Sequence, residues 1–213
     1  MKNKYIIFDL DDTLMYEIDY LESAYLRIAS MLDENNSGQL FEKMITSYKD
    51  KQDTFSLLET EYTVSKHELL DIYRNHYPLL KVNEDVNFVL DYIKNKNYKL
   101  GLITDGRSVT QRNKLKALNI ESLFDEIIIS EEFGSTKPNE NNYKVFMTDT
   151  NMDYFYIGDN PKKDFITPNK LGWQTIALKD RGRNIHQQNF DESLEHKPHF
   201  IIDNLRELIN YIS

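Results

Sequence analysis

The residues with the clearest chemical potential lie between Asp9 and Asp12, directly after the short apolar run Tyr5–Phe8. Carboxylates that cluster at the end of a buried strand are costly unless a cation or another partner neutralises them. Asp, Thr and backbone carbonyl groups supply hard oxygen ligands, which suit magnesium better than zinc or copper. The segment therefore predicts a catalytic carboxylate pair beside a metal ion. The alternative is a solvated turn that caps a helix, because Asp and Thr also favour such places.

A second acidic group follows the apolar run Phe155–Ile157, at Asp159 and Asp164. In a parallel α/β sheet the carboxyl ends of the strands share one rim, so residues that follow separate strands converge in one crevice. Two acidic groups at strand ends can then share one ion. The sequence therefore predicts a joint site that combines Asp9 and Asp11 with this second group.

Short runs rich in Ile, Tyr and Phe have the composition of buried strands. The expected strands are Lys4–Asp9, Lys99–Thr104, Glu126–Ser130, Tyr154–Gly158 and Gln174–Leu178. Apolar residues at helical spacing predict helices over Val86–Ile93, Val109–Leu118 and Leu205–Ile212. Further helices are expected after Pro138 and Pro161, because a first helical turn tolerates proline. Alternating strands and helices predict an α/β fold with a Rossmann-like, doubly wound parallel sheet.

The segment between the first two strands is much longer than one crossover helix requires, and it contains no convincing strand. Apolar residues from Ile18 to Leu32 step by three and four, and Gln39–Lys49 and Ser65–Tyr77 can also form helices. We therefore expect an α/β core formed by residues 1–14 and 83–213, with a small all-helical domain inserted at residues 15–82.

Composition limits the possible partners. A net charge of -9 argues against nonspecific attraction to nucleic acid or to an anionic membrane, and favours a small-molecule partner. The absence of cysteine excludes disulfides, thiolate nucleophiles and cysteine-based zinc sites. No apolar run approaches the length of a membrane span, and the first one is interrupted at Asp9, so we expect a cytoplasmic protein. The oligomeric state is left open.

Four separated motifs give the chain a resemblance to phosphatases of the haloacid dehalogenase superfamily, over nearly its whole length. The motifs are Asp9-Leu10-Asp11-Asp12-Thr13-Leu14, Ile103-Thr104-Asp105-Gly106, Thr136-Lys137-Pro138-Asn139, and Gly158-Asp159 with Asp164. Each lies at the end of an expected strand or the start of an expected helix. The resemblance implies a core of the expected α/β type with a helical cap inserted after the first motif.

The resemblance assigns roles to the first motif. Asp9 is the expected nucleophile, and its attack on phosphorus gives an aspartyl phosphate. Asp11 is the expected general acid toward the leaving alcohol and general base toward water. The spacing of Asp9 and Asp11 would send both side chains the same way in extended backbone. In this superfamily an acid at the position of Asp11 distinguishes phosphatases from true dehalogenases. Asp12 is expected to cap or hydrogen-bond locally.

The remaining motifs supply binding groups. The Thr104 hydroxyl, the Asp105 backbone N–H and the Lys137 ammonium suit the transferring phosphoryl oxygens. The resemblance implies that magnesium is held by the Asp9 side chain, the Asp11 carbonyl and Asp159. Asp164 is expected to orient the metal ligands or Lys137 from outside the metal's own ligand set.

The resemblance implies an Mg²⁺-dependent hydrolase of small phosphomonoesters, of phosphosugar, phosphoglycolate or nucleotide type, that acts through an aspartyl phosphate. The helical insert would act as a lid and set the specificity. One alternative is a phosphomutase or phosphotransferase, which passes the phosphoryl group to a second alcohol. Another is a non-catalytic binding protein, although the catalytic set at Asp9, Asp11 and Lys137 is complete. The physiological substrate is not determined by these residues.

Overall fold

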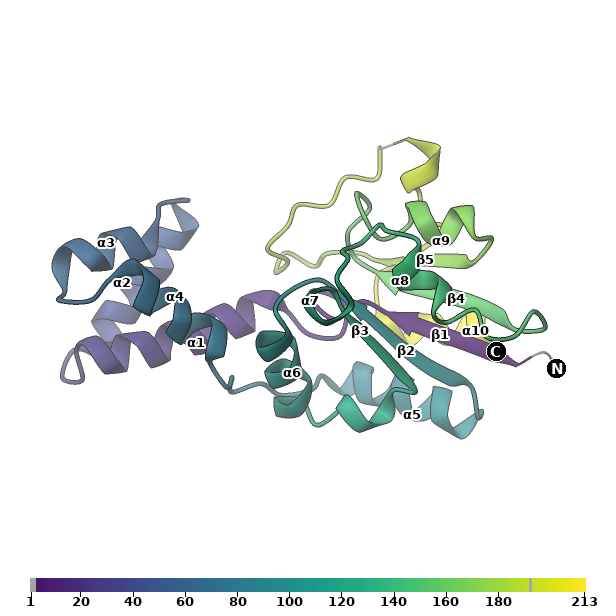
Figure 1. Cartoon of the computed structure of the whole chain (residues 1–213), viewed down its shortest axis with the longest axis horizontal. Helices are drawn as coiled ribbons and strands as arrows, with labels where there is room; N and C mark the ends of the chain where they lie inside the picture. Colours follow the sequence, from purple (N-terminus) through teal and green to yellow (C-terminus); the bar gives the residue numbers. More distant parts are fainter. Residues whose placement is uncertain (1–2, 192) are drawn as a thin grey trace.

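The computed structural model describes residues 3–191 and 193–213. Six parallel strands form one sheet in the order β3-β2-β1-β4-β5-β6 (Figure 1). The strands are β1 (Lys4–Phe8), β2 (Lys99–Thr104), β3 (Glu126–Ile129), β4 (Asp153–Gly158), β5 (Gln174–Leu178) and β6 (Phe200–Ile202). The predicted Rossmann-like α/β fold is therefore confirmed.

The strand order places a topological switch point between β1 and β4. The chain moves outward from β1 to β2 and β3, then returns to the other side of β1 and continues through β4, β5 and β6. Phe8 at the end of β1 pairs with Leu102 of β2 and with Ile157 of β4. Ligands of open α/β sheets bind outside the carboxyl ends of the strands at such a point. Residues that directly follow β1 and β4 are thus placed where a site is expected.

Side chains of β1 alternate between two hydrophobic clusters, as the two-residue period of a strand requires. Ile6 and Phe8 belong to the larger cluster, with residues of α5 (Glu84–Asn95), α6 (Ser108–Ala117) and α10 (Ile209–Ile212). Tyr5 and Ile7 belong to the other, with residues in and beside α8 (Asn141–Lys144) and α9 (Ile166–Lys170). Both faces of β1 are covered, which explains its continuous apolar sequence. The remaining short elements are α7 (Ser130–Phe133), η1 (Glu121–Leu123), η2 (Leu194–His196) and η3 (Leu205–Leu208).

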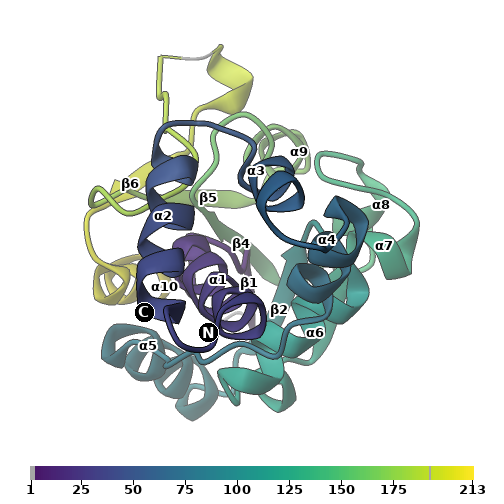
Figure 2. The same ribbon diagram turned by 90° about the vertical axis from the view of Figure 1, so that its left-hand side faces the viewer.

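Four helices lie between β1 and α5: α1 (Glu17–Leu32), α2 (Ser37–Lys49), α3 (Thr54–Glu61) and α4 (Lys66–Asn75). They stand beyond one end of the sheet, at the left of Figure 1, and face the viewer in Figure 2. Buried residues of these helices, such as Tyr25, Met44, Leu58 and Leu69, form a third hydrophobic cluster. The all-helical character of the insert is as expected. The domain boundaries at residues 15 and 82 stay a prediction.

Several details differ from the sequence-based expectation. Helix α3 and the edge strand β6 were not predicted, because both are short and two of the three β6 residues are exposed. Helices follow Pro138 and Pro161 as expected, but α8 begins only at Asn141 and α9 at Ile166, so neither proline lies in a first helical turn. The C-terminal pattern forms a short 3-10 turn before α10 rather than one regular helix. No helix in the described part of the chain is long and apolar enough to cross a membrane.

Candidate active site

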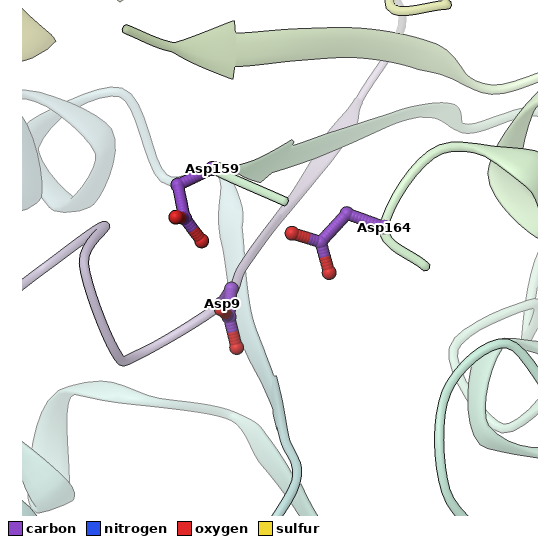
Figure 3. Close-up of side chains that lie close together, drawn as sticks. All are labelled: Asp9, Asp159 and Asp164. Carbon is purple, nitrogen blue, oxygen red and sulfur yellow. The ribbon is translucent and has the colours of Figure 1, made fainter. Parts of the chain in front are cut away.

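Three aspartates converge at the carboxyl edge of the sheet, as Figure 3 shows. Asp9 follows β1, and its backbone N–H donates to the Ile157 carbonyl of β4 at 2.8 Å. Asp159 follows β4, and Asp164 lies in the loop before α9. One carboxylate oxygen from each aspartate lies within 4.8 Å of the others, and all three residues are buried. The two acidic groups of the sequence are therefore brought into one site.

Gly158 makes room for this convergence. A Cβ atom at position 158 would lie 2.5 Å from Asp164 Oδ2, so any other residue would displace that carboxylate. The same oxygen accepts a hydrogen bond from the Asn160 backbone N–H at 2.8 Å. Glycine directly before Asp159 is thus explained by the close approach of a second acid.

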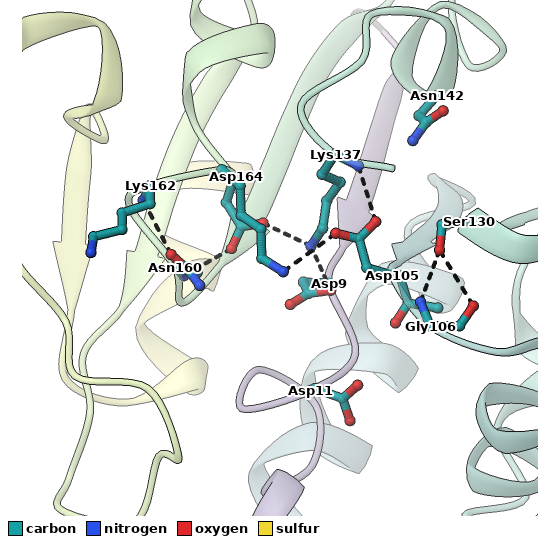
Figure 4. A network of polar contacts seen from close by, with 12 residues as sticks. Asp9, Asp11, Asp105, Gly106, Ser130, Lys137, Asn142, Asn160, Lys162 and Asp164 are labelled. Carbon is teal, nitrogen blue, oxygen red and sulfur yellow. Dashed lines mark hydrogen bonds and ion pairs between the residues drawn. The ribbon is translucent and has the colours of Figure 1, made fainter. Parts of the chain in front are cut away.

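Lys137 neutralises part of this cluster. Its Nζ lies 2.8 Å from Asp9 Oδ1 and 2.7 Å from Asp164 Oδ1 (Figure 4). The loop that carries it is held by Asp105, whose Oδ1 accepts from the Lys137 backbone N–H at 3.0 Å. Two of the three buried carboxylates therefore share one buried ammonium group, and the third, Asp159, accepts a hydrogen bond from the Asn184 side-chain amide at 2.9 Å. The expected link between Asp164 and Lys137 is present.

Burial and the excess of carboxylates over ammonium groups shift the pKa values of the residues in this cluster. Burial raises the pKa of Asp9 to about 7, where Lys137 opposes the shift and Asp164 adds to it. Burial, followed by the charges of Asp164 and Asp9, raises the pKa of Asp159 to about 9. Although burial opposes its charge, Asp164 and Asp9 raise the pKa of Lys137 well above its ordinary value. The cluster is short of positive charge, and its oxygen donors are those that a magnesium ion prefers.

Thr104 and Asp105 close another side of the same cavity. Thr104 ends β2 and is 1% exposed, and its hydroxyl accepts a hydrogen bond from the Gln111 side-chain amide. The Asp105 carboxylate contacts Lys163 Nζ at 3.3 Å in addition to the Lys137 N–H. Sequence reasoning considered only the Asp105 backbone. The structure adds that the side chain anchors the loop of Lys137.

Asp11 does not extend β1, which corrects the argument from extended backbone. The strand ends at Phe8, and the Leu10 carbonyl accepts from the Leu14 N–H at 2.9 Å in a turn. Asp12 has a φ of 57° within this turn. The Asp11 side chain consequently lies apart from the group formed by Asp9, Lys137 and Asp164 (Figure 4). It still lines the same cavity as Asp9, so both aspartates can meet one substrate.

Comparisons with known proteins agree with this geometry. The family model described as haloacid dehalogenase-like hydrolase matches residues 6–178. The chain belongs to this family. A glyceraldehyde 3-phosphate phosphatase from Methanocaldococcus jannaschii is 26% identical, covering 98% of this chain and 96% of the relative. A phosphoglycolate phosphatase from Aquifex aeolicus is also 26% identical, covering 76% of this chain and 73% of the relative.

A similar fold is found in the solved structure of the hydrolase YfnB from Bacillus subtilis, with a TM-score of 0.67. The two proteins are 18% identical, and the match covers 100% of each chain. This likeness shows the fold alone. The family match and the phosphatase relatives confirm the predicted class: the chain is a haloacid dehalogenase-type phosphatase.

Sequence reasoning missed several residues of this hydrolase's site. The cavity has a volume of about 100 Å³, and Glu17, Lys163 and His186 contribute to its wall. Glu17 lies in the first turn of α1, and burial together with the charge of Asp11 raises its pKa to about 7. Gln111 and Lys114 of α6 were also missed, although both bind Asp11. Their signal in the sequence is weak, because α6 is largely polar and reads as a solvated helix.

Asp12 serves the fold of this hydrolase, as expected. Its Oδ1 accepts from the Glu17 N–H at 2.9 Å and so caps α1. Its Oδ2 accepts from the Ile185 N–H at 3.1 Å, which ties the loop after β5 to the first motif. Arg183 of that loop pairs with Asp19 of α1 at 2.5 Å. The loop after β5 therefore connects the sheet to the helical insert.

Proposed function

We propose that this chain is a magnesium-dependent phosphatase that hydrolyses small phosphomonoesters through an aspartyl phosphate on Asp9. The observation that carries the proposal is the buried cluster of Asp9, Asp159 and Asp164 at the switch point of the sheet, where Lys137 pairs with Asp9 and Asp164. Such a cluster needs further positive charge and offers a nucleophilic carboxylate next to an ammonium group. The relatives named for glyceraldehyde 3-phosphate and phosphoglycolate support short phosphomonoesters as substrates.

The substrate phosphate binds between Asp9, Thr104 and Lys137. The hydroxyl of Thr104, the backbone N–H of Asp105 and the ammonium of Lys137 donate to its oxygens. These donors stabilise the charge of the transferring phosphoryl group where it develops. Because Lys137 also contacts Asp9 at 2.8 Å, it can bring the nucleophile and the phosphate together.

Asp9, Asp159 and the Asp11 carbonyl would hold magnesium, and Asp164 would support them. Both Asp164 oxygens are already engaged, one by Lys137 and one by the Asn160 N–H, which suits a supporting role. Magnesium held there would supply positive charge that offsets the repulsion between the Asp9 carboxylate and the substrate phosphate. The solved structure of YfnB is described as bound to magnesium, which is consistent with this assignment.

The chemistry requires two steps. In the first, an Asp9 oxygen bonds to phosphorus while the bond to the leaving oxygen breaks, and Asp11 gives its proton to that oxygen, so that an alcohol departs. In the second, the ionised Asp11 takes a proton from water as the water oxygen bonds to phosphorus and the bond to Asp9 breaks. Phosphate departs, and both aspartates return to their starting states. Proton transfer of this kind contributes roughly 10²- to 10⁴-fold to the rate.

Helices α1–α4, within the predicted domain at residues 15–82, act as a lid over this cavity. Glu17 of α1 already forms part of the wall, so the insert can contact the leaving group directly. Closure excludes bulk water during phosphoryl transfer and opening releases the product. A small-molecule substrate fits this site, and the absence of nucleic-acid partners and the cytoplasmic location stay predictions.

A screen of phosphorylated metabolites tests the proposal. Purified protein is incubated with phosphosugars, phosphoglycolate, nucleotides and an aryl phosphate, with Mg²⁺ or with EDTA, and free phosphate is measured. We expect release with Mg²⁺ only, and loss of turnover in Asp9→Asn with an unchanged circular dichroism spectrum. Asp203→Asn is the matched control, because the Asp203 side chain is 78% exposed and lies outside the cavity wall.

The outcomes separate the proposal from its alternatives. Isomerised or transferred product without free phosphate would show a phosphomutase or phosphotransferase. No reaction with any phosphomonoester would favour the non-catalytic binding protein. Persistent activity in Asp9→Asn would show that another group is the nucleophile.

A further inference from the structure

Two polar side chains occupy the buried face of α6. The buried residues of this helix are Gln111, Lys114 and Leu115, and the first two are 1% and 3% exposed. Residues three positions apart on a helix lie on the same face. Gln111 and Lys114 therefore point together into the interior, where an apolar residue is the usual choice.

Both side chains bind Asp11, each at a different oxygen. Lys114 Nζ lies 2.7 Å from Asp11 Oδ1, and the Gln111 side-chain amide donates to Asp11 Oδ2 at 2.9 Å. The same amide donates to the Thr104 hydroxyl and, at 3.2 Å, to the Asp105 carbonyl. An ionised carboxylate has about four acceptor directions, so positions remain for a proton or a substrate. One helix thus fixes the orientation of Asp11 and links it to the phosphate-binding loop.

The Lys114 ammonium group also packs against an aromatic side chain of α1. Its Nζ lies 4.8 Å from the ring centroid of Tyr20 on α1. The Tyr20 hydroxyl donates to the Tyr73 carbonyl at 2.6 Å, so the ring is itself fixed. A buried ion pair is a weak source of stability, because desolvation offsets the attraction of the charges. Stability alone therefore does not explain a lysine at position 114.

We propose that Lys114 and Gln111 are positioning residues for Asp11, which hold its carboxyl group where it can exchange a proton with the leaving oxygen. This inference rests on the proposed function, in which Asp11 is the acid and base. Neither side chain exchanges the proton itself. Both act through the orientation of Asp11, and a small misplacement of a reacting group costs about 10²-fold in rate.

The test compares two phosphomonoesters that need the proton to different extents. Glycerol phosphate has a poor leaving group that must be protonated, whereas 4-nitrophenyl phosphate has a good one that needs little help. The measured quantity is kcat/KM, which reports the steps up to alcohol release. We expect Lys114→Met to lower kcat/KM for glycerol phosphate by about 10- to 100-fold and for 4-nitrophenyl phosphate by less than about threefold.

Further variants distinguish positioning from stability. Gln111→Leu removes the second contact without changing charge, and should give the same substrate dependence to a lesser degree. Lys114→Arg keeps a cation and should recover part of the lost activity. Lys116→Met is the matched control, because Lys116 lies on the exposed face of α6 and should behave as the unmodified protein. Unfolding midpoints are measured for all variants.

Asp11→Asn provides the reference for the interpretation. If it shows the substrate dependence and neither Lys114→Met nor Gln111→Leu does, the positioning role is wrong while the proposed function stands. Equal losses on both substrates in these two variants would also overturn the positioning role. If Asp11→Asn lacks the dependence, Asp11 is not the acid. In the double variant of Asp11→Asn with Lys114→Met, we expect little further loss, because the two residues act as one unit.

Discussion

Asp9 and Asp11 are separated by one residue, yet their surroundings differ in charge. Asp9 belongs to a buried group of three carboxylates, of which Asp9 and Asp164 pair with the ammonium of Lys137. Asp11 has its own ammonium from Lys114 and an amide from Gln111. The first group requires a further cation, whereas the contacts of Asp11 are supplied by the protein. The difference fits the two proposed tasks, in which the Asp9 carboxylate attacks phosphorus beside a metal ion and the Asp11 carboxyl group exchanges a proton.

Among the substitutions that test this difference, one at Lys137 should have the largest effect. Lys137→Met leaves Asp9 and Asp164 buried without the ammonium group that pairs with them, and removal of one partner from a buried ion pair costs about 3–5 kcal/mol. We expect a loss of this order in the free energy of unfolding at pH 8 and no measurable phosphatase activity. The loss should shrink at pH 5, where the carboxylates can take up protons. Urea denaturation in EDTA at the two pH values measures both effects.

Lys163→Met is the control for this experiment. Lys163 is 38% exposed at its side chain and contacts Asp105 at 3.3 Å, so its removal should cost less than about 1 kcal/mol. Equal destabilisation of the two variants would contradict the view that the buried cluster depends on Lys137.

The effect of pH on the metal-free protein provides a second prediction. Burial raises the pKa of Asp9 to about 7 and that of Asp159 to about 9, so the folded protein holds these protons more tightly than the unfolded chain. Below about pH 4 both states are protonated and nothing is lost. As the pH rises toward 9, the unfolded chain ionises first, and the free energy of unfolding falls.

Magnesium should offset this loss. At a hundredfold excess over its Kd the ion adds about 2.7 kcal/mol to stability, and the gain should grow with pH because protons compete for the same oxygens. Thermal unfolding at pH 5, 7 and 9, with Mg²⁺ or EDTA, measures the gain. Asp159→Asn should flatten the pH dependence in EDTA and remove most of the gain. A gain that is the same at pH 5 and pH 9 would be inconsistent with the assigned ligands.

The same comparison explains how far the sequence predicted the site. Asp9 and Asp159 directly follow apolar strands, so the parallel sheet alone brings them together, and the four motifs supply Thr104 and Lys137. The orientation of Asp11 depends on a turn with positive φ at Asp12, which apolar periodicity does not encode. Gln111 and Lys114 reach Asp11 only because α6 packs over the first motif. Their long-range contacts leave no periodic signal.

Substitution of Glu17, which lies near Asp11, should have the smallest and most selective effect. It lies in the cavity wall, and among the hydrogen bonds found for the described residues none involves its carboxylate. Burial and the charge of Asp11 raise its pKa to about 7, so a larger share of this carboxyl group is ionised at pH 8 than at pH 6. An anionic leaving group should therefore be repelled more strongly at pH 8.

We expect Glu17→Gln to raise kcat/KM for phosphoglycolate relative to glycerol phosphate by about fivefold at pH 8, which corresponds to removal of roughly 1 kcal/mol of repulsion. The change at pH 6 should be smaller, because a larger share of the Glu17 carboxyl is then protonated in the unmodified protein. Comparison of the two substrates in one variant cancels any general effect on phosphoryl transfer. Glu22→Gln, on the same helix but outside the cavity wall, should leave the ratio unchanged. A ratio that does not respond to Glu17→Gln at either pH would place the leaving group away from α1.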